Sequence, residues 1–455
     1  MSTETLFQRF VERTPVTVMV RATLENLFSA QAVDDIFAAS AQRQRPSGLL
    51  FSSVVDLLSL VVFRERRSIN EAYLRVQDQF RVSLKSVYGK LNGVETTVCR
   101  ELVRRTAQPL AAVVDSWQLP RRALLRGYRT RILDGNHLAA TEHRLEVLRR
   151  TRSGPLPGQA LVVLDPDRML ITDVFPWEDG HSQERLILPQ LIPTAQEWDL
   201  WIADRNFCTT DFLFGLTERN ACFVIRQHAS TLSWEQESRP KKIGRCPTGM
   251  IYQQTLLLTR GQETLLVRRT TIRLDVPNRA GETEIHLLTN LPRRAANAYK
   301  VAELYLERWT IESAFQELEQ ALRSEIDTLG YPGAALLGFS VAAVTYNVLS
   351  LVKWAIELEH GAEGARVELS GYYLAAAVAE DYSGMMIALP EQEWTRRFAE
   401  LTPRQLGAKL REYARYVRPH QFRKHSRGPK LPRPPRASGK TNHHVSTARL
   451  LAAQK

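Results

Sequence analysis

Cysteine is scarce in this chain, with four among 455 residues, and the four lie far apart in the sequence. They are Cys99, Cys208, Cys222 and Cys246. No two of them have the close spacing that a structural zinc site or a redox dithiol requires. Scattered cysteines without pairs favour a reducing compartment, so we expect the protein in the cytoplasm.

Other features are missing as well. No Gly-x4-Gly-Lys-Ser/Thr motif occurs, which disfavours a P-loop NTPase, and the first residues lack the features of a secretory signal. Long apolar runs are limited to residues 48–63, which include Asp56, and residues 334–352, which are uncharged. The second run is about as long as a minimal membrane span. Charged Lys353 and Glu357 flank it and no other span accompanies it, so we expect a buried core helix and no membrane association.

Acidic residues are nearly absent from one part of the chain. The formal net charge is +12, and the stretch from Arg404 to Lys440 holds twelve Lys or Arg and one acid, Glu412. Residues 423–440 are rich in Pro and Gly, which predicts an extended basic tail rather than a packed helix. Such a tail either keeps the protein soluble or lies along a polyanion, to which it would bind through counterion release.

The length predicts two to four domains, and the first of them, residues 1–120, reads as helical. Within it, residues 84–91 and 95–106 flank Asn92-Gly93 and have the outline of a helix-turn-helix, although any hairpin of helices with Gly in its turn would match. A cluster of three basic residues in the second of these helices is compatible with DNA binding: Arg100, Arg104 and Arg105.

After Pro120 the pattern changes to strands alternating with helices, which predicts an α/β core with a mixed sheet. We expect strands at 128–134, 159–165, 169–175, 198–204 and 221–227, a proline-kinked helix at 182–197 and a helix at 209–219. The first part of this core spans 121–227, a β-rich insertion follows at 228–292, and the core resumes at 293–358. A helical C-terminal region with the basic tail completes the chain at 359–455.

The segment from 305 to 320 combines an apolar stripe with a polar row. On a helical wheel, Tyr305, Arg308, Glu312 and Glu319 fall along the edge of a buried face. That face is formed by Leu304, Ile311, Phe315, Leu318 and Leu322. This segment by itself also fits a solvated surface on which Arg308 and Glu312 form an i,i+4 ion pair.

Three acids, one of them in this segment, suit a metal centre. Asp134 and Asp204 each end a predicted strand of one sheet, and Glu312 lies on a helix beside that sheet. Three carboxylates without His or Cys suit Mg²⁺ or Mn²⁺, which prefer oxygen ligands. Two such ions, about 3.5–4 Å apart, activate the attacking oxygen and stabilise the leaving oxygen in phosphoryl transfer.

Three short blocks carry a family resemblance: "ILDGN" with Asp134, "IADRNF" with Asp204, and "YLERWTIESAF". They resemble the signature blocks of insertion-sequence transposases, which have an RNase H-like fold and a catalytic Asp-Asp-Glu triad. The last block is similar to the branch marked by Tyr-x2-Arg-x3-Glu-x6-Lys, insertion sequence family four. The resemblance runs from about residue 20 to 451, with the β-rich insertion between Asp204 and Glu312.

The resemblance implies a DNA transposase whose Asp134, Asp204 and Glu312 hold the metal, Mg²⁺ or Mn²⁺ and two ions in all. Its partners would be double-stranded DNA, namely the element's terminal inverted repeats and the target, with two copies of the chain in a synaptic complex. It would nick the element ends, excise the element through a hairpin and use the freed 3′ hydroxyl for strand transfer, in a prokaryotic cytoplasm at the nucleoid. The alternatives are a catalytically lapsed DNA-binding regulator and a stand-alone RNase H-like endonuclease.

Several residues are candidates for DNA contact: Tyr305, Arg308, Arg205, Arg323 and Trp234. The resemblance has departures. Glu319 takes the place of the signature Lys, for which Arg323 could substitute, and Asn136 and Asn206 replace the usual Thr or Ser and Gly.

Other titratable residues near the strand ends are weaker candidates. His137 could move a proton but fits a local hydrogen bond better. Asp165 and Asp167 fit a hairpin turn, and Asp173 lies within a strand, so none of these three is expected to be catalytic.

Overall fold

The computed structural model describes residues 2–44, 48–79, 82–118, 123–139, 145–149, 154–228, 232–278, 281–365, 367–425 and 444–453. Helices fill the chain up to Ser116, as the sequence predicts: α1 Thr3–Arg13, α2 Pro15–Leu27, α3 Ala30–Ser40, α4 Phe51–Val62, α5 Ile69–Val76, η1 Gln77–Gln79, α6 Leu84–Asn92 and α7 Thr96–Ser116. Four of these helices begin after a serine whose hydroxyl accepts a backbone N–H of the first turn: Ser2, Ser29, Ser68 and Ser83.

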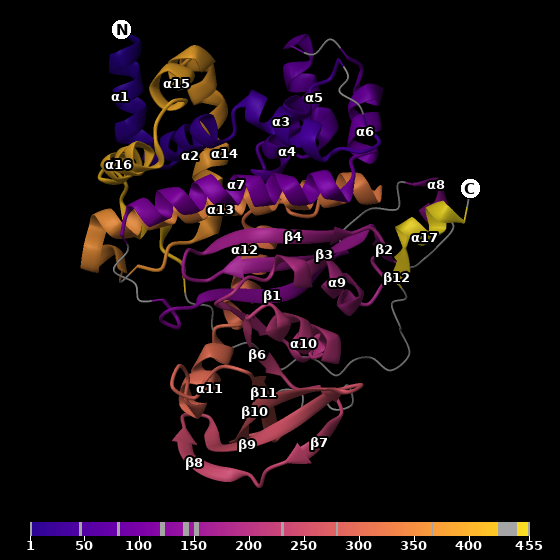
Figure 1. Ribbon diagram of the computed structural model, residues 1–455. Coiled ribbons are helices and arrows are strands. Elements are labelled where there is room, and N and C mark those ends of the chain that lie inside the picture. The colour runs from indigo at the N-terminus through magenta and orange to yellow at the C-terminus, as the bar shows by residue number, and fades with distance from the viewer. Residues whose placement is uncertain are drawn as a thin grey trace.

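A mixed sheet forms the centre of the molecule, which confirms the predicted α/β class (Figure 1). Its first strands are β1 Arg129–Leu138, β3 Gly158–Asp165, β4 Leu170–Trp177, β5 Asp199–Ala203 and β6 Cys222–Arg226. β3 and β4 form the predicted hairpin, while β5 runs parallel to both β1 and β6. The predicted proline-kinked helix is broken into short turns, η2 Glu184–Ile187, α9 Leu188–Leu191 and η3 Ile192–Thr194, before α10 Thr210–Glu218.

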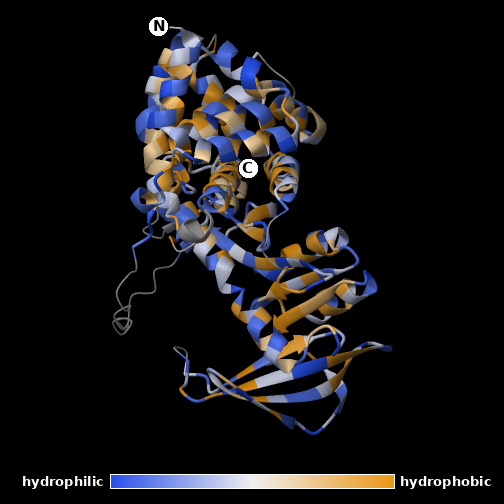
Figure 2. Ribbon diagram, turned by 90° about the vertical axis from the view of Figure 1, so that its left-hand side faces the viewer, coloured by the Kyte–Doolittle hydropathy of each residue, from blue (hydrophilic) through white to orange (hydrophobic). Residues whose placement is uncertain are grey.

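The β-rich insertion continues this sheet. Its strands are β7 Trp234–Glu237, β8 Lys241–Cys246, β9 Gly249–Arg260, β10 Glu263–Leu274 and β11 Glu284–Thr289. β11 pairs with β6, which gives the strand order β4-β3-β1-β5-β6-β11-β10-β9-β7, with β8 paired to β9. Bands of apolar and polar residues follow one another along these strands at the bottom of Figure 2.

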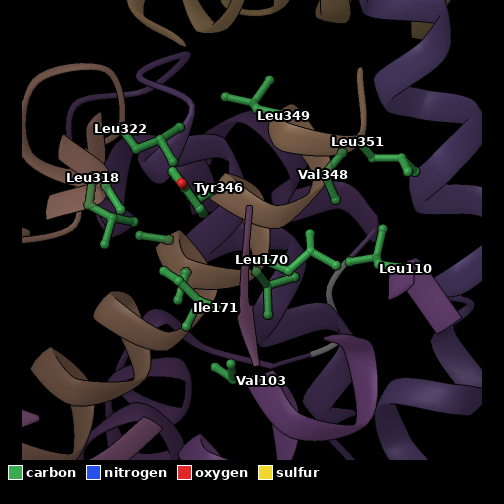
Figure 3. Packing of buried hydrophobic residues seen from close by; sticks show 14 of the residues in the cluster. Val103, Leu110, Leu170, Ile171, Leu318, Leu322, Tyr346, Val348, Leu349 and Leu351 are labelled. Atoms are coloured by element: carbon green, nitrogen blue, oxygen red, sulfur yellow. The ribbon is translucent and has the colours of Figure 1, made fainter. Parts of the chain in front are cut away.

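Helices from three parts of the chain pack on one face of the sheet. α7, α12 Trp309–Gln320 and α13 Pro332–Ala365 meet β4, β1 and β3 there. Figure 3 shows the resulting cluster around Leu170 and Ile171 of β4, and the buried Asn347 side chain of α13 bonds both the N–H (2.7 Å) and the carbonyl (2.8 Å) of Ile171. α9 and α10 cover a second core on the opposite face.

α13 contains the long apolar run of the sequence. The helix from Pro332 to Gly361 is long and apolar enough to cross a membrane, but its most apolar window is completely buried within the protein. The expected core helix therefore accounts for this run.

The two ends of the chain form one helical lobe. α14 Gly371–Ala388, α15 Glu391–Phe398 and α16 Pro403–Ala414 all pack against α2. Asn26 of α2 donates hydrogen bonds to the carbonyls of Phe398 (2.6 Å) and Leu401 (2.9 Å). N-terminal and C-terminal helices therefore share a core, whereas the sequence analysis assigns residues 1–120 and 359–455 to separate regions.

The chain contacts the rest of the protein at the start of the basic tail, residues 423–440, and again after its end. Lys424, near the start of the tail, pairs with Glu368. After the tail, β12 His444–Ser446 pairs with β2 Gly154–Leu156 and leads into α17 Thr447–Ala452. Residues 426–443, which contain most of the predicted tail, lie outside the described residues. Upstream, Arg411 and Arg415 are engaged by Glu359.

Candidate active site

Parallel pairing of β1 and β5 places the first two acids side by side. Leu133 and Ala203 are the last register partners of these two strands, and Asp134 and Asp204 are the residues that directly follow them. β1 does not end at Asp134 as predicted, because β3 continues to pair with it as far as Leu138. β5 stops at Ala203, which leaves this part of β1 with an open edge beside Asp204.

The helical segment beside the sheet is not one continuous helix. α11 Ala298–Leu306 ends just before Arg308, and α12 begins at Trp309. Tyr305 and Arg308, predicted at the edge of the buried face, are both buried, each 7% exposed. Tyr305 lies in the last turn of α11 and reaches Asp204, and Arg308 lies in the turn between the helices and reaches Asp134.

Arg308 connects two of the three acids. Its Nη1 lies 3.2 Å from Asp134 Oδ2, and its Nη2 lies 2.9 Å from Glu312 Oε1. The hydroxyl of Tyr305 donates to Asp204 Oδ1 at 3.2 Å. Five of the predicted site residues therefore lie together: Asp134, Asp204, Tyr305, Arg308 and Glu312.

Burial and mutual charge perturb these groups. Burial is the main reason that the pKa of Asp134 is raised to about 6, although Arg308 and the N–H of Gly135 oppose the shift. Glu184 and Asp204 raise it further by repulsion. Burial would lower the pKa of Arg308, yet Tyr305, Asp134, Asp204 and Glu312 together raise it, so the guanidinium stays charged. The pKa of Tyr305 is raised by burial and by Asp204.

In the metal-free protein, the titration of Asp134 is expected to lower the free energy of unfolding as the pH rises. The ordinary pKa of an aspartate side chain is 3.8 and that of Asp134 in the fold is about 6, so folding favours the protonated form. That contribution is complete below pH 4 and is lost as the pH rises through 6. Between pH 3 and 7 the wild type should lose about 3 kcal/mol relative to Asp134→Asn, which does not titrate.

Urea unfolding of both proteins in EDTA at several pH values measures this loss. A constant difference in unfolding free energy across the range would contradict the expectation.

The three acidic side chains are of the chemical type that binds divalent cations. The three groups are carboxylates, which Mg²⁺ and Mn²⁺ prefer, and two of them already bind one cation, the Arg308 guanidinium. Among the described residues, no group of three or more His, Cys, Asp or Glu is close enough to hold a metal ion as placed. Arg308 therefore stands between carboxylates that would have to approach one another to share an ion.

The other predicted DNA-contact residues lie elsewhere. Arg205 turns away from Asp204 and pairs with Glu282 of the insertion at 3.0 Å. Arg323 donates to the carbonyl of Arg67 at 2.6 Å, so it faces the N-terminal helices. Trp234 packs against the second core, and its ring lies 5.8 Å from the guanidinium carbon of Arg269. Glu319, at the signature Lys position, is exposed.

The weaker candidates have structural contacts. Asp165 pairs with Arg131 (2.9 Å) and Arg168 (2.8 Å), which suits the hairpin turn. Asp173 pairs with Arg100 at 2.8 Å, so Arg100 of the predicted helix-turn-helix is engaged by β4. The other two basic residues of that cluster, Arg104 and Arg105, pair with Glu101 of their own helix.

Two further residues at the site were not singled out from the sequence. Trp309 is 55% exposed, and its ring lies 4.8 Å from the guanidinium carbon of Arg308. Its position next to Arg308 in the third block is the only sequence feature that points to it. Glu184 lies beside Asp134 and His137, and no motif marks it.

Comparison with known proteins agrees with this geometry. Residues 126–347 match the family described as Transposase DDE domain, a range that includes all five clustered residues. No curated protein matches the chain. The central mixed sheet, its parallel strands and the flanking helical regions are consistent with an RNase H-like DDE domain. The chain thus contains, over residues 126–347, a transposase DDE domain, which belongs to a catalytic family.

Proposed function

We propose that the chain is the transposase of an insertion sequence of the Tyr-Arg-Glu-Lys branch, insertion sequence family four. In this proposal Asp134, Asp204 and Glu312 hold two Mg²⁺ or Mn²⁺ ions, and the substrate is the double-stranded DNA of the element's ends and its target. The observation that carries it is the buried guanidinium of Arg308, shared by Asp134 and Glu312 next to Asp204.

The bound ions would activate the attacking oxygen and stabilise the leaving oxygen of the scissile phosphate. The side chains of the protein have distinct tasks. Asp134 and Asp204 offer their oxygens from adjacent, rigid strands, and α12 brings Glu312 to the same edge. The planar guanidinium of Arg308 can donate two hydrogen bonds to the oxygens of a phosphate, as it can to carboxylates. When DNA enters, Arg308 and the hydroxyl of Tyr305 would leave the acids for the phosphate, which frees those acids for metal.

The proposed reaction is nicking at each element end by water, hairpin-mediated excision, and strand transfer by the freed 3′ hydroxyl. Exposed Trp309, stacked beside Arg308, is placed to contact a base next to the cut. Two copies of the chain would join both ends in a synaptic complex, in the cytoplasm at the nucleoid.

An in vitro reaction with a plasmid carrying both element ends tests this proposal. We expect nicked, hairpin and excised products with Mg²⁺ or Mn²⁺, and none with EDTA, with Glu312→Gln or with a plasmid that lacks the ends. Precut ends incubated with target DNA should give joined products.

The same reactions separate the alternatives. Cleavage without joining would identify a stand-alone endonuclease. Binding to the ends without any cleavage in either metal would identify a lapsed regulator, which the exposed Glu319 in place of the signature Lys favours slightly.

A further inference from the structure

A fourth acid approaches the site from the other side of β1. Glu184 is the first residue of η2, and its carboxylate lies over Gly135, the residue directly after Asp134. A Cβ atom at position 135 would lie 2.0 Å from Glu184 Oε1, which is far inside van der Waals contact. Only glycine at this position therefore permits the acid to come so close to the strand.

The loop before Glu184 is held in place by a buried side chain. Gln159 of β3, 1% exposed, donates from Nε2 to the carbonyls of Asp179 (3.1 Å) and Ser182 (2.8 Å). Asp179 is also paired with Arg449 of α17 at 2.7 Å. These contacts fix the backbone just before η2 and so hold Glu184 at a position from which its side chain reaches β1.

The charge of Glu184 has little compensation. Its side chain is only 15% exposed, and within the described part of the chain no Lys or Arg forms an ion pair with it. The nearest donors are Asn206 Nδ2 at 3.5 Å from Oε2 and His137 Nδ1 at 3.7 Å from Oε1. A largely buried carboxylate without a fixed cation is costly, and a bound cation would offset that cost.

Glu184 is also linked to both aspartates of the site. Asn206, which replaces the usual Gly of the second block, lies two residues after Asp204 and contacts Glu184. The Glu184 carboxylate lies over Gly135, the residue that directly follows Asp134 on β1.

We propose that Glu184 is a fourth carboxylate of the divalent-cation site formed by Asp134, Asp204 and Glu312. This rests on the proposed function, because it assumes that those three acids bind metal. Four carboxylates carry the charge that balances two divalent cations, whereas Asp134, Asp204 and Glu312 alone carry one negative charge fewer. Glu184 would contribute an oxygen ligand, or would hold a metal-bound water, from the η2 side of β1.

Binding of Mn²⁺ to the full-length protein without DNA, measured by electron paramagnetic resonance of the free ion, tests the assignment. Glu184→Gln keeps the shape of the side chain and should lower Mn²⁺ affinity by at least about tenfold. Glu178→Gln, an exposed acid of the same loop, removes the same charge and should leave the affinity unchanged. Equal affinities of wild type and Glu184→Gln would overturn the proposal.

Asp134→Asn separates this proposal from the proposed function. If Asp134→Asn abolishes Mn²⁺ binding but Glu184→Gln does not, only the role of Glu184 is wrong. If neither variant changes binding, the metal site itself is wrong.

Gly135→Ala offers an independent test, because its methyl group would push the Glu184 carboxylate away from β1. It should lower Mn²⁺ affinity in the wild-type background but not further in Glu184→Gln. Equal losses in both backgrounds would contradict the proposal.

Discussion

Asp134→Asn is expected to reduce DNA cleavage by at least about 10³-fold, which corresponds to about 4 kcal/mol of transition-state stabilisation. The amide cannot replace the charged oxygen that a divalent ion would require. Its single amide oxygen can still accept the N–H of Gly135, which lies 2.9 Å from Asp134 Oδ1, although the hydrogen bond that Arg308 donates to Oδ2 is lost. The variant should therefore remain folded and bind element ends.

Cleavage and gel-shift assays on the same preparation measure both properties. Asp167→Asn is the matched control. Asp167 lies in the turn between β3 and β4 and accepts the N–H of Leu124, so the activity of this variant should stay within a few-fold of wild type. Normal cleavage by Asp134→Asn would remove Asp134 from the site.

Arg308→Ala is expected to have two opposite effects. Cleavage should fall by about 10²–10³-fold, because the proposed function assigns this buried donor to the reacting phosphate. Affinity for Mn²⁺ without DNA should rise, because the guanidinium no longer competes with the ion for Asp134 and Glu312. Arg308→Lys should show cleavage and Mn²⁺ affinity between those of the wild type and Arg308→Ala, since an ammonium group cannot reproduce both contacts.

Calorimetric titration with Mn²⁺ and single-turnover cleavage measure these effects separately. Arg205→Ala serves for comparison, because Arg205 follows Asp204 directly yet is 47% exposed and paired with Glu282. A fall in metal affinity in Arg308→Ala would mean that Arg308 supports the metal site rather than competing for it.

Much of the fold was predictable from local patterns. Alternating apolar residues and turn residues located the core strands, and the uncharged run at 334–352 was correctly assigned to a core helix. Contacts between distant segments were not predictable in this way. Pairing of β11 with β6 joins the insertion to the central sheet, and packing of α14–α16 on α2 joins the two terminal regions. Neither interaction can be recognised from the hydrophobic periodicity of the sequence.

The site shows the same division. Asp134, Asp204 and Glu312 could be predicted as candidates because each lies in a short block with a recognisable setting. The burial of Arg308 was missed because a helical wheel treats residues 305–320 as one helix, whereas the chain turns between Leu306 and Trp309. Glu184 was missed because its approach depends on a glycine 49 positions earlier, Gly135, and on a loop held by Gln159.

The shared core of the two chain ends has a consequence for how this protein can be made. α2 is covered by helices that extend to Ala414, and the rings of Phe7 and Trp394 lie 5.6 Å apart. During synthesis the N-terminal helices cannot reach their final packing until the ribosome has released almost the entire chain. Prematurely terminated products would expose an apolar surface on α2 and become substrates for proteases, instead of persisting as small DNA-binding fragments.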